Sequence, residues 1–156
     1  MFSFLKRGTK IFFYFFVFIF FLIATFFIFN KKNVDNFAEI KINNVELRVE
    51  LAQDSAKHYL GLSNRETLEG ISGMLFLFSD KQERTFVMRD MLISLDIVFI
   101  DENTIIDVYK NLPFDKKSQE ILYQSSVPID KVLELEAGLF DYYNFQVGDK
   151  IEILKD

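Results

Sequence analysis

The sequence contains no cysteine and only one histidine, His58, in a chain of 156 residues. The absence of cysteine excludes disulfides, thiolate metal sites and a cysteine nucleophile, and it is compatible with either side of a membrane. Because neither a cysteine nor a second histidine is present, we predict no metal site and no cofactor, and we place His58 on the surface of a helix. Patterns of the Gly-x-Gly-x-x-Gly or Gly-Lys-Ser type are also missing, which argues against a phosphate-binding loop.

Charge is missing from one long stretch near the N-terminus. Residues 11–29, IFFYFFVFIFFLIATFFIF, contain ten of the 20 phenylalanines and no charged residue. As a helix this stretch would be about 28 Å long, close to the roughly 30 Å hydrocarbon core of a bilayer. We therefore predict a transmembrane anchor. A cleaved signal peptide, which has a shorter apolar region followed by small residues, is the alternative.

The charges on either side of this stretch predict its orientation. Lys6, Arg7 and Lys10 precede it, whereas Lys31 and Lys32 follow it, so the positive-inside bias favours a cytoplasmic N-terminus. The predicted organisation is a basic N-terminus (1–10), the anchor or signal segment (11–29), a linker (30–36) and a β domain (37–156). We expect a single-pass protein of the inner membrane with a periplasmic domain, or a secreted protein if the segment is cleaved.

The remaining residues, 33–156, carry 13 basic and 23 acidic side chains, and so a formal charge of −10. Such a field disfavours binding to nucleic acid or to an anionic lipid surface. We therefore predict no nucleic-acid partner. A small polar ligand, a cation or a basic protein remains compatible with the charge.

Short apolar runs with frequent turns predict a mainly β domain. From Ala38 to Leu51 apolar residues alternate on each side of Asn43-Asn44, the pattern of a β-hairpin. Asp54 or Ser55 can cap a short helix that runs to Leu62. Further strands are predicted at 74–78, 85–88, 95–100, 104–109, 121–124, 132–136 and 150–154, with one helical turn at 139–144. This number of short strands predicts a compact β-sandwich or barrel-like domain with one or two short helices.

Three motifs lie within one forty-residue block. They are GLSNR (61–65), GMLFLF (73–78) and FVMRDM (86–91), the last continuing to SLDIVFI (94–100). VLEL (132–135), Ala137-Gly138 and Gly148-Asp149 follow. Together they resemble a family of small bacterial and archaeal domains known as domain of unknown function 192, over about 45–153. The resemblance implies the fold family and leaves open which reaction, if any, the protein carries out.

The motifs also depart from the family pattern. Val87 stands where tryptophan is usual, and Asp90-Met91 replaces Asn-Thr. Ser63 stands where methionine is common, and Ser94 where proline is common. If the family shares a binding surface, these changes predict a wider and more acidic pocket in this chain.

Asp96 is the most suggestive single residue, because it interrupts a run that is apolar on both strand faces. A buried carboxylate must find partners or shift its pKa upward. Asp96 is therefore either a structural residue, paired with an arginine or bonded to the backbone, or a carboxylate placed in a ligand cleft. Arg65 and Arg89 are its candidate partners, and their planar donors could also bind a carboxylate, a phosphate or sugar hydroxyls.

Two more acidic residues complete the predicted site. Asp90 could line the same pocket as Arg89 or occupy a surface turn. Glu134 lies opposite Leu133 and Leu135 in strand alternation, so it either faces water or joins the site. Met74, Met88 and Met91 are interpreted as core residues rather than metal ligands.

Three hypotheses for function follow. The first is a membrane-anchored ligand-binding domain whose cleft is lined by Arg65, Arg89, Asp90, Asp96 and Glu134. The second is a hydrolase or carbohydrate-modifying enzyme with Asp96 and Glu134 as acid and base, which requires both carboxylates to face one cavity about 5–10 Å apart. The third is a structural or protein-interaction module that uses an exposed strand edge.

Overall fold

The computed structural model describes residues 18–20, 36–115 and 121–155, and it divides the chain into two units, one ending at Val34 and one beginning at Asp35. Residues 18–20 are helical. Among the described residues no helix is both long and apolar enough to cross a membrane. The predicted segments 1–10, 11–29 and 30–36 lie outside the described residues, apart from 18–20 and Asn36, so the anchor stays a prediction.

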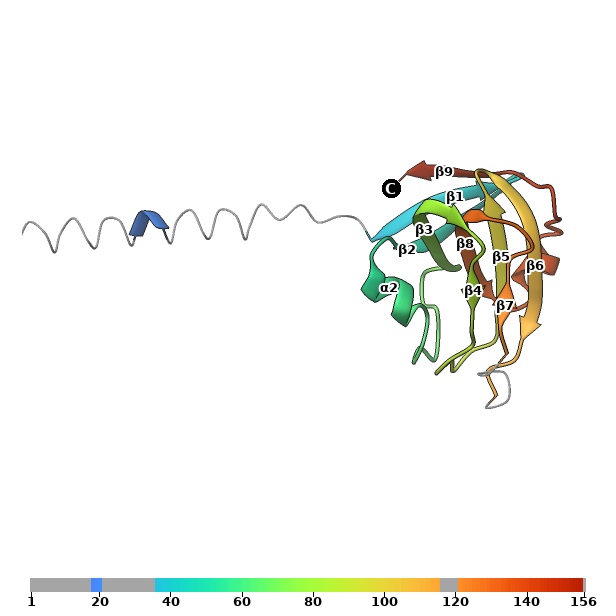
Figure 1. The fold of residues 1–156 in the computed structure, drawn as a ribbon, viewed down its shortest axis with the longest axis horizontal. Coiled ribbons are helices and arrows are strands. Elements are labelled where there is room, and N and C mark those ends of the chain that lie inside the picture. The colour runs from blue at the N-terminus through green and yellow to red at the C-terminus, as the bar shows by residue number, and fades with distance from the viewer. Residues whose placement is uncertain (1–17, 21–35, 116–120, 156) are drawn as a thin grey trace, which may run out of the picture. The chain divides into compact units, whose positions relative to one another are not determined.

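The second unit is a mainly β domain built on one curled, half-barrel sheet (Figure 1). Its seven strands have the order β6-β5-β8-β3-β2-β1-β9, and every neighbouring pair is antiparallel except β2 and β3. A second sheet pairs β4 with β7. The strands are β1 (Phe37–Ile42), β2 (Val45–Ala52), β3 (Gly73–Gln82), β4 (Thr85–Phe86), β5 (Leu95–Asp101), β6 (Thr104–Leu112), β7 (Tyr123–Gln124), β8 (Ile129–Glu136) and β9 (Ile151–Lys155). The predicted mainly β class is confirmed.

The predicted hairpin and helix are both present. β1 and β2 pair antiparallel up to Ile42 and Val45, and Asn43 in the turn has a φ of 55°, a conformation that asparagine tolerates. The helix α2 (Ser55–Leu60) begins after Asp54, whose Oδ1 accepts a hydrogen bond of 2.8 Å from the Lys57 backbone N–H. The predicted helical turn is α3 (Leu139–Tyr142).

Two hydrophobic clusters cover the two faces of the seven-stranded sheet. One contains Ile40, Val49, Leu75 and Leu133, and the other contains Phe76, Ile97, Phe99 and Val132. Alternation explains the division, because neighbouring residues of a strand point to opposite faces. Met74, Met88 and Met91 are all buried in the second cluster, which confirms that they are core residues.

Some strands differ in length from the prediction. β3 continues through four exposed residues to Gln82, because Gln82 still pairs with Ile129 of β8. β4 is shorter than predicted and ends at Phe86, since Met88 already lies in the core. Apolar alternation cannot locate either end.

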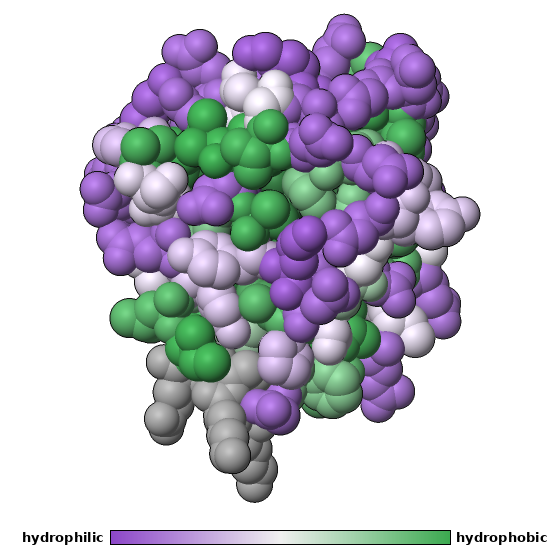
Figure 2. Space-filling view, turned by 90° about the vertical axis from the view of Figure 1, so that its right-hand side faces the viewer, coloured by the Kyte–Doolittle hydropathy of each residue, from purple (hydrophilic) through white to green (hydrophobic). Residues whose placement is uncertain are grey.

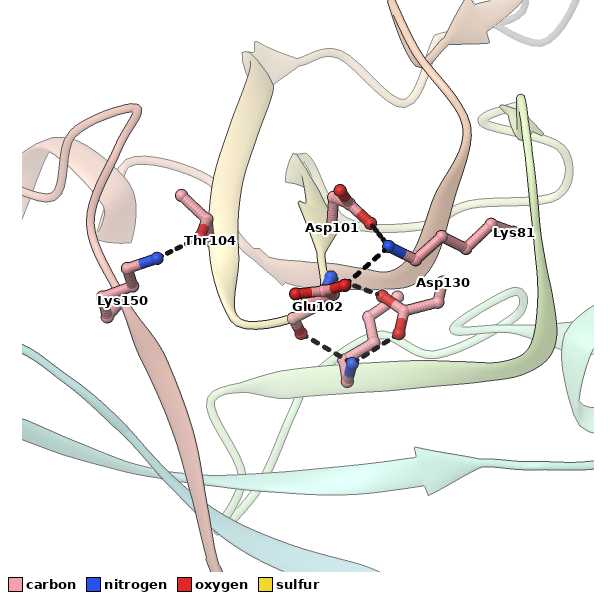
Figure 3. A network of polar contacts seen from close by, with 7 residues as sticks. Lys81, Asp101, Glu102, Thr104, Asp130 and Lys150 are labelled. Atoms are coloured by element: carbon pink, nitrogen blue, oxygen red, sulfur yellow. Dashed lines mark hydrogen bonds and ion pairs between the residues drawn. The ribbon is translucent and has the colours of Figure 1, made fainter.

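A network of polar contacts joins the far end of β3 to the turn between β5 and β6 (Figure 3). The Lys81 Nζ lies 2.6 Å from the Asp101 Oδ1 and 3.1 Å from the Glu102 Oε1. The contacts with these two carboxylates, that with Asp101 first, raise the pKa of Lys81. Asp130 accepts a hydrogen bond from the Glu102 backbone N–H, and the Lys131 Nζ donates to the Glu102 carbonyl. The network ties together the ends of neighbouring strands, and its carboxylates already have partners.

The surface of the domain mixes hydrophilic and hydrophobic residues. Figure 2 shows one face, on which hydrophilic residues separate several groups of hydrophobic ones. Among the described residues, exposed apolar side chains include Phe114, Ile121 and Leu122. Because the hydrophobic groups on this face are scattered, they do not define a binding surface by themselves. A concave site is a better indicator of where a ligand binds.

Candidate functional site

A pocket of about 490 Å³ lies between α2, the turn that follows it, β3, the segment around β4, and β8. We call it the Glu134 pocket. Its lining combines aromatic and aliphatic side chains with two arginines and two glutamates: His58, Tyr59, Leu60, Gly61, Leu62, Ser63, Phe76, Phe78, Glu83, Arg84, Thr85, Phe86, Val87, Arg89, Met91 and Glu134. The volume falls in the range of about 300–1,000 Å³ that is typical of small-molecule sites.

Glu134 is the residue that distinguishes this pocket. In the sheet it pairs with Met74 of β3 and Ile97 of β5, and it is only 5% exposed. Its Oε2 is buried and has no hydrogen-bond partner among the described residues. The interpretation of Glu134 as a strand residue facing water is therefore wrong, because α2 and the segment around β4 cover this face of the sheet.

Burial changes the protonation of this carboxyl. Desolvation raises the pKa of Glu134 to about 8, and the positive charge of Arg65 opposes this shift only partly. The side chain is therefore mainly the neutral acid at pH 7. A neutral carboxyl can donate one hydrogen bond from its O–H and accept others.

Two motif glycines allow the chain to approach Glu134. Gly61 follows α2 with a φ of 52°, and a Cβ added there would lie 3.6 Å from the Glu134 Oε2 and 3.4 Å from the Phe76 Cζ. At Gly73 a Cβ would lie 1.8 Å from the Glu134 backbone oxygen, which is a severe overlap. Gly73 therefore lets β3 lie close to β8, and Gly61 leaves space beside the Glu134 carboxyl.

Arg65 lies beside the pocket rather than in its lining. Its Nη2 forms an ion pair of 2.8 Å with the Glu50 Oε2, and the Lys57 Nζ lies 3.7 Å from the other oxygen of Glu50. Glu50 pairs with Met74, which pairs in turn with Glu134, so the two glutamates occupy one row across three strands. Arg65 acts on Glu134 through its charge.

Arg89 lines the pocket, whereas Asp90 does not. The Arg89 guanidinium lies 4.1 Å above the Tyr59 ring, and its Nη2 donates a hydrogen bond of 2.6 Å to the Tyr59 carbonyl. Asp90 is exposed, with a φ of 53° and its Oδ2 3.9 Å from the Arg89 Nε. Ser63 and Asn64 donate to the carbonyls of Arg89 and Asp90. The first and third motifs therefore fold as one unit at the edge of the pocket.

Arg84 is a pocket residue that the sequence did not reveal. Its guanidinium lies 4.0 Å above the Phe78 ring and pairs with the Asp80 Oδ1 at 2.6 Å. Its Nε is buried and has no hydrogen-bond partner among the described residues. Arg84 follows the exposed polar residues that end β3, and no periodic signal separates it from the other charges there.

His58, which was predicted on the surface of the helix, also lines the pocket. The side chain is half-buried, its ring lies 4.6 Å from that of Phe78, and its Nε2 is 3.0 Å from the Ala52 carbonyl oxygen. Because a carbonyl only accepts, this contact requires a proton on Nε2.

Asp96 lies apart from the other predicted site residues. It pairs with Leu135, whereas Glu134 pairs with Ile97, so the two carboxylates point to opposite faces of the sheet. Asp96 is fully buried and accepts hydrogen bonds from three backbone N–H groups, those of Asn111 at 2.7 Å, Gly138 at 2.9 Å and Phe140 at 3.1 Å. Its contacts are those of a backbone-bonded structural aspartate. The opposite faces also remove the predicted acid–base pair.

The half-barrel with its pocket defines a class of small β domains, and comparison with known proteins places the chain within it. The family called domain of unknown function 192, described as an uncharacterized ACR, matches residues 38–153. The chain belongs to this family, which confirms the resemblance of the motifs. No curated protein matches the chain.

Two solved structures are similar to this chain. One is a candidate transcription regulator from Sinorhizobium meliloti, with 28% identity and a TM-score of 0.69 over 75% of this chain and 93% of the other. The second is a protein of unknown function from Novosphingobium aromaticivorans, with 29% identity and a TM-score of 0.66 over 77% of this chain and 89% of the other.

Proposed function

We propose that the domain binds a small organic ligand in the Glu134 pocket. One observation carries this proposal: a carboxyl that is 5% exposed lines a pocket of about 490 Å³, and its Oε2 has no hydrogen-bond partner among the described residues. A buried polar group without a partner costs about 1–3 kcal/mol or more, which a folded domain avoids when no function requires it. A ligand that forms the missing hydrogen bond recovers this cost.

The walls of the pocket support a ligand with an apolar body. Phe76 and Phe86 meet edge to face with ring centroids 4.9 Å apart, and Leu62 and Met91 add aliphatic and thioether surface. Arg89 contributes polar donors to the same pocket. Apolar and aromatic contact surface beside a few placed polar groups is typical of small-molecule sites.

The predicted catalytic pair of the enzyme hypothesis is not formed. It required Asp96 and Glu134 to act across one cavity, and the strand register places them on opposite faces of the sheet. Ligand binding needs only one of the two carboxylates. We therefore base the proposed function on Glu134 alone.

We also propose that residues 11–29 anchor the domain to the inner membrane, with the domain in the periplasm. The support is the uncharged run of nineteen residues and the basic residues that precede it. A reporter fused after Asp156 tests the orientation. We expect activity from a reporter that works only in the periplasm, and activity from a cytoplasmic reporter alone would contradict the proposal.

A screen with two matched glycine variants tests ligand binding. A fragment library is screened against the full chain in mild detergent by ligand-observed NMR, and each hit is repeated with Gly61→Ala and Gly70→Ala. Both glycines have positive φ, at 52° and 76°, so both variants carry backbone strain. Only the methyl at position 61 would meet Glu134 and Phe76, since the methyl at position 70 meets nothing within 4 Å.

We expect hits that bind the wild-type chain and Gly70→Ala but bind Gly61→Ala at least about tenfold more weakly. Circular dichroism establishes that both variants are folded. Equal loss of binding in the two variants would show that strain and not the pocket is responsible. A library without any hit sensitive to Gly61→Ala would contradict the proposed function.

A further inference from the structure

We propose that the ligand of the Glu134 pocket is a small carboxylate with an apolar body, held by hydrogen bonds from the Glu134 carboxyl and from Arg84. This inference rests on the proposed function and adds the chemical class of the ligand. It also makes binding dependent on a proton carried by the protein.

The first support is the placement of buried polar atoms that lack hydrogen bonds. In the described part of the chain there are three such side-chain atoms, the Arg84 Nε, the Asp101 Oδ1 and the Glu134 Oε2. The Asp101 oxygen already forms an ion pair of 2.6 Å with Lys81 in the network of Figure 3. The other two belong to residues that line the Glu134 pocket. The two missing hydrogen bonds therefore belong to residues of the same pocket.

The second support is that both groups can act as hydrogen-bond donors. The Nε of arginine can only donate, and the guanidinium stays charged at every physiological pH. A buried carboxyl that holds its proton also has an O–H to donate. Two donors in one pocket call for a ligand with acceptor oxygens. A carboxylate supplies two such oxygens, and its hydrogen bonds to charged or acidic donors are the stronger kind.

The third support is the charge around Glu134. Titratable or charged groups on the surrounding elements are Glu50, Lys57, His58, Tyr59, Arg65, Asp80, Glu83, Arg84, Arg89 and Asp90. Within the lining, the two arginines outnumber the one other carboxylate, Glu83, which accepts a hydrogen bond of 2.9 Å from Gln124. Asp80 and Asp90 lie against these arginines from just outside the lining, so the charges are largely balanced. The Arg84 Nε is left without a hydrogen bond by this pairing, and an anionic ligand can accept from it, whereas an amine cation cannot.

Binding of a carboxylate depends on the proton of Glu134. Two carboxylates in contact repel each other, so ionised Glu134 disfavours the ligand that neutral Glu134 binds. Since burial raises the pKa of Glu134 to about 8, the neutral form dominates at pH 7 and becomes the minor form at pH 9. An amine ligand would show the opposite dependence, because it pairs with the ionised form.

A panel of matched probes tests the class of ligand. Butyrate, hexanoate, phenylacetate and 3-phenylpropionate are each compared with the carboxamide and the amine of the same body. Isothermal titration calorimetry is run on the full chain in mild detergent at about pH 7 and about pH 9, a range in which simple carboxylates stay ionised and simple alkylamines stay mainly protonated. Glu134→Gln serves as the second protein, because its amide N–H donates at both pH values.

We expect the carboxylates to bind most tightly and to lose about tenfold in affinity between about pH 7 and about pH 9, as the neutral fraction of Glu134 falls. In Glu134→Gln binding persists and this pH dependence disappears. Tighter binding of the amines, or a pH dependence that survives in Glu134→Gln, overturns the carboxylate proposal.

If none of the probes binds, the fragment screen distinguishes the carboxylate proposal from the more general proposal of ligand binding. If no carboxylate binds while fragments sensitive to Gly61→Ala do, the pocket is a binding site of another chemical class, and this inference is wrong. If neither the panel nor any fragment binds, the proposed function fails as well.

Discussion

Asp96 of β5 and Glu134 of β8 are carried by adjacent strands, and they point to opposite faces of the sheet. Three backbone N–H groups bind the Asp96 carboxylate, whereas the Glu134 Oε2 has no partner among the described residues. The first carboxylate is therefore part of the structural framework. The second lines the Glu134 pocket and has a raised pKa because burial disfavours its charged form.

Replacing Glu134 by glutamine is expected to remove a pH dependence of stability. The pKa of Glu134 is about 8 in the folded state, above the usual 4.5 that applies on unfolding. The stabilisation of the protonated form is therefore complete below about pH 4.5 and is lost as the pH rises to about 8, by an amount on the order of 5 kcal/mol. Urea unfolding of both proteins across this range measures the difference. Parallel curves for the two proteins would contradict the expectation.

Replacing Arg65 by glutamine is expected to raise the pKa of Glu134 further. The positive charge of Arg65 lowers this pKa, so its removal leaves desolvation unopposed. Arg48→Gln is the matched control, because Arg48 lies over the Phe37 ring and does not contribute to the pKa of Glu134. A ¹³C NMR titration of the carboxyl follows both variants. An unchanged pKa in Arg65→Gln, or equal shifts in both variants, would show that Arg65 does not act on Glu134.

Asp96→Asn is expected to destabilise the domain by roughly 3 kcal/mol, because an amide cannot accept hydrogen bonds at both positions of the carboxylate. The Asp96 Oδ2 accepts from Gly138 and Phe140, and the Oδ1 accepts from Asn111. Asp107→Asn on neighbouring β6 is the control, since among the described residues Asp107 accepts a single backbone hydrogen bond, from the adjacent Val108 N–H. Chemical denaturation measures both. A loss in Asp96→Asn no larger than in Asp107→Asn would argue against the framework role.

Gly73→Ala is expected to cost about 3 kcal/mol or more, because its methyl would overlap the Glu134 backbone oxygen and push β3 away from β8. Ser72→Ala tests the adjacent position, where the half-buried side chain is only shortened and an effect within about 1 kcal/mol is expected. Thermal unfolding compares the two. Similar melting temperatures for both variants would mean that the strands adjust to a methyl group at position 73.

Local patterns predicted much of the fold. The hairpin from Phe37 to Ala52 follows from alternation around Asn43, and α2 follows from the capping side chain of Asp54. Both signals lie within a few residues of the structure that they predict. The parallel pairing of β2 with β3 has no such signal, because it joins strands separated by a helix and a long loop.

The candidate site was predicted only in part. Strand alternation assigned Glu134 to the face opposite Leu133, but alternation cannot say whether that face is covered. The cover comes from α2 and from the segment around Arg84, both distant in sequence from β8. Arg89 was found because it lies in a motif. Asp96 also lies in a motif and serves the framework, so motif membership does not separate ligand contacts from structural ones.

The protonation of Glu134 is the property on which the proposed site depends most. A ¹³C NMR titration of the full chain with labelled glutamate, assigned by comparison with Glu134→Gln, measures it directly. We expect one carboxyl to titrate with a pKa near 8, absent from the variant, while simple exposed glutamates titrate near 4.3. A pKa of Glu134 near 4.3 would show that the carboxyl is solvated or paired in solution, and it would contradict both the unpartnered site and the binding of carboxylates that we infer from it.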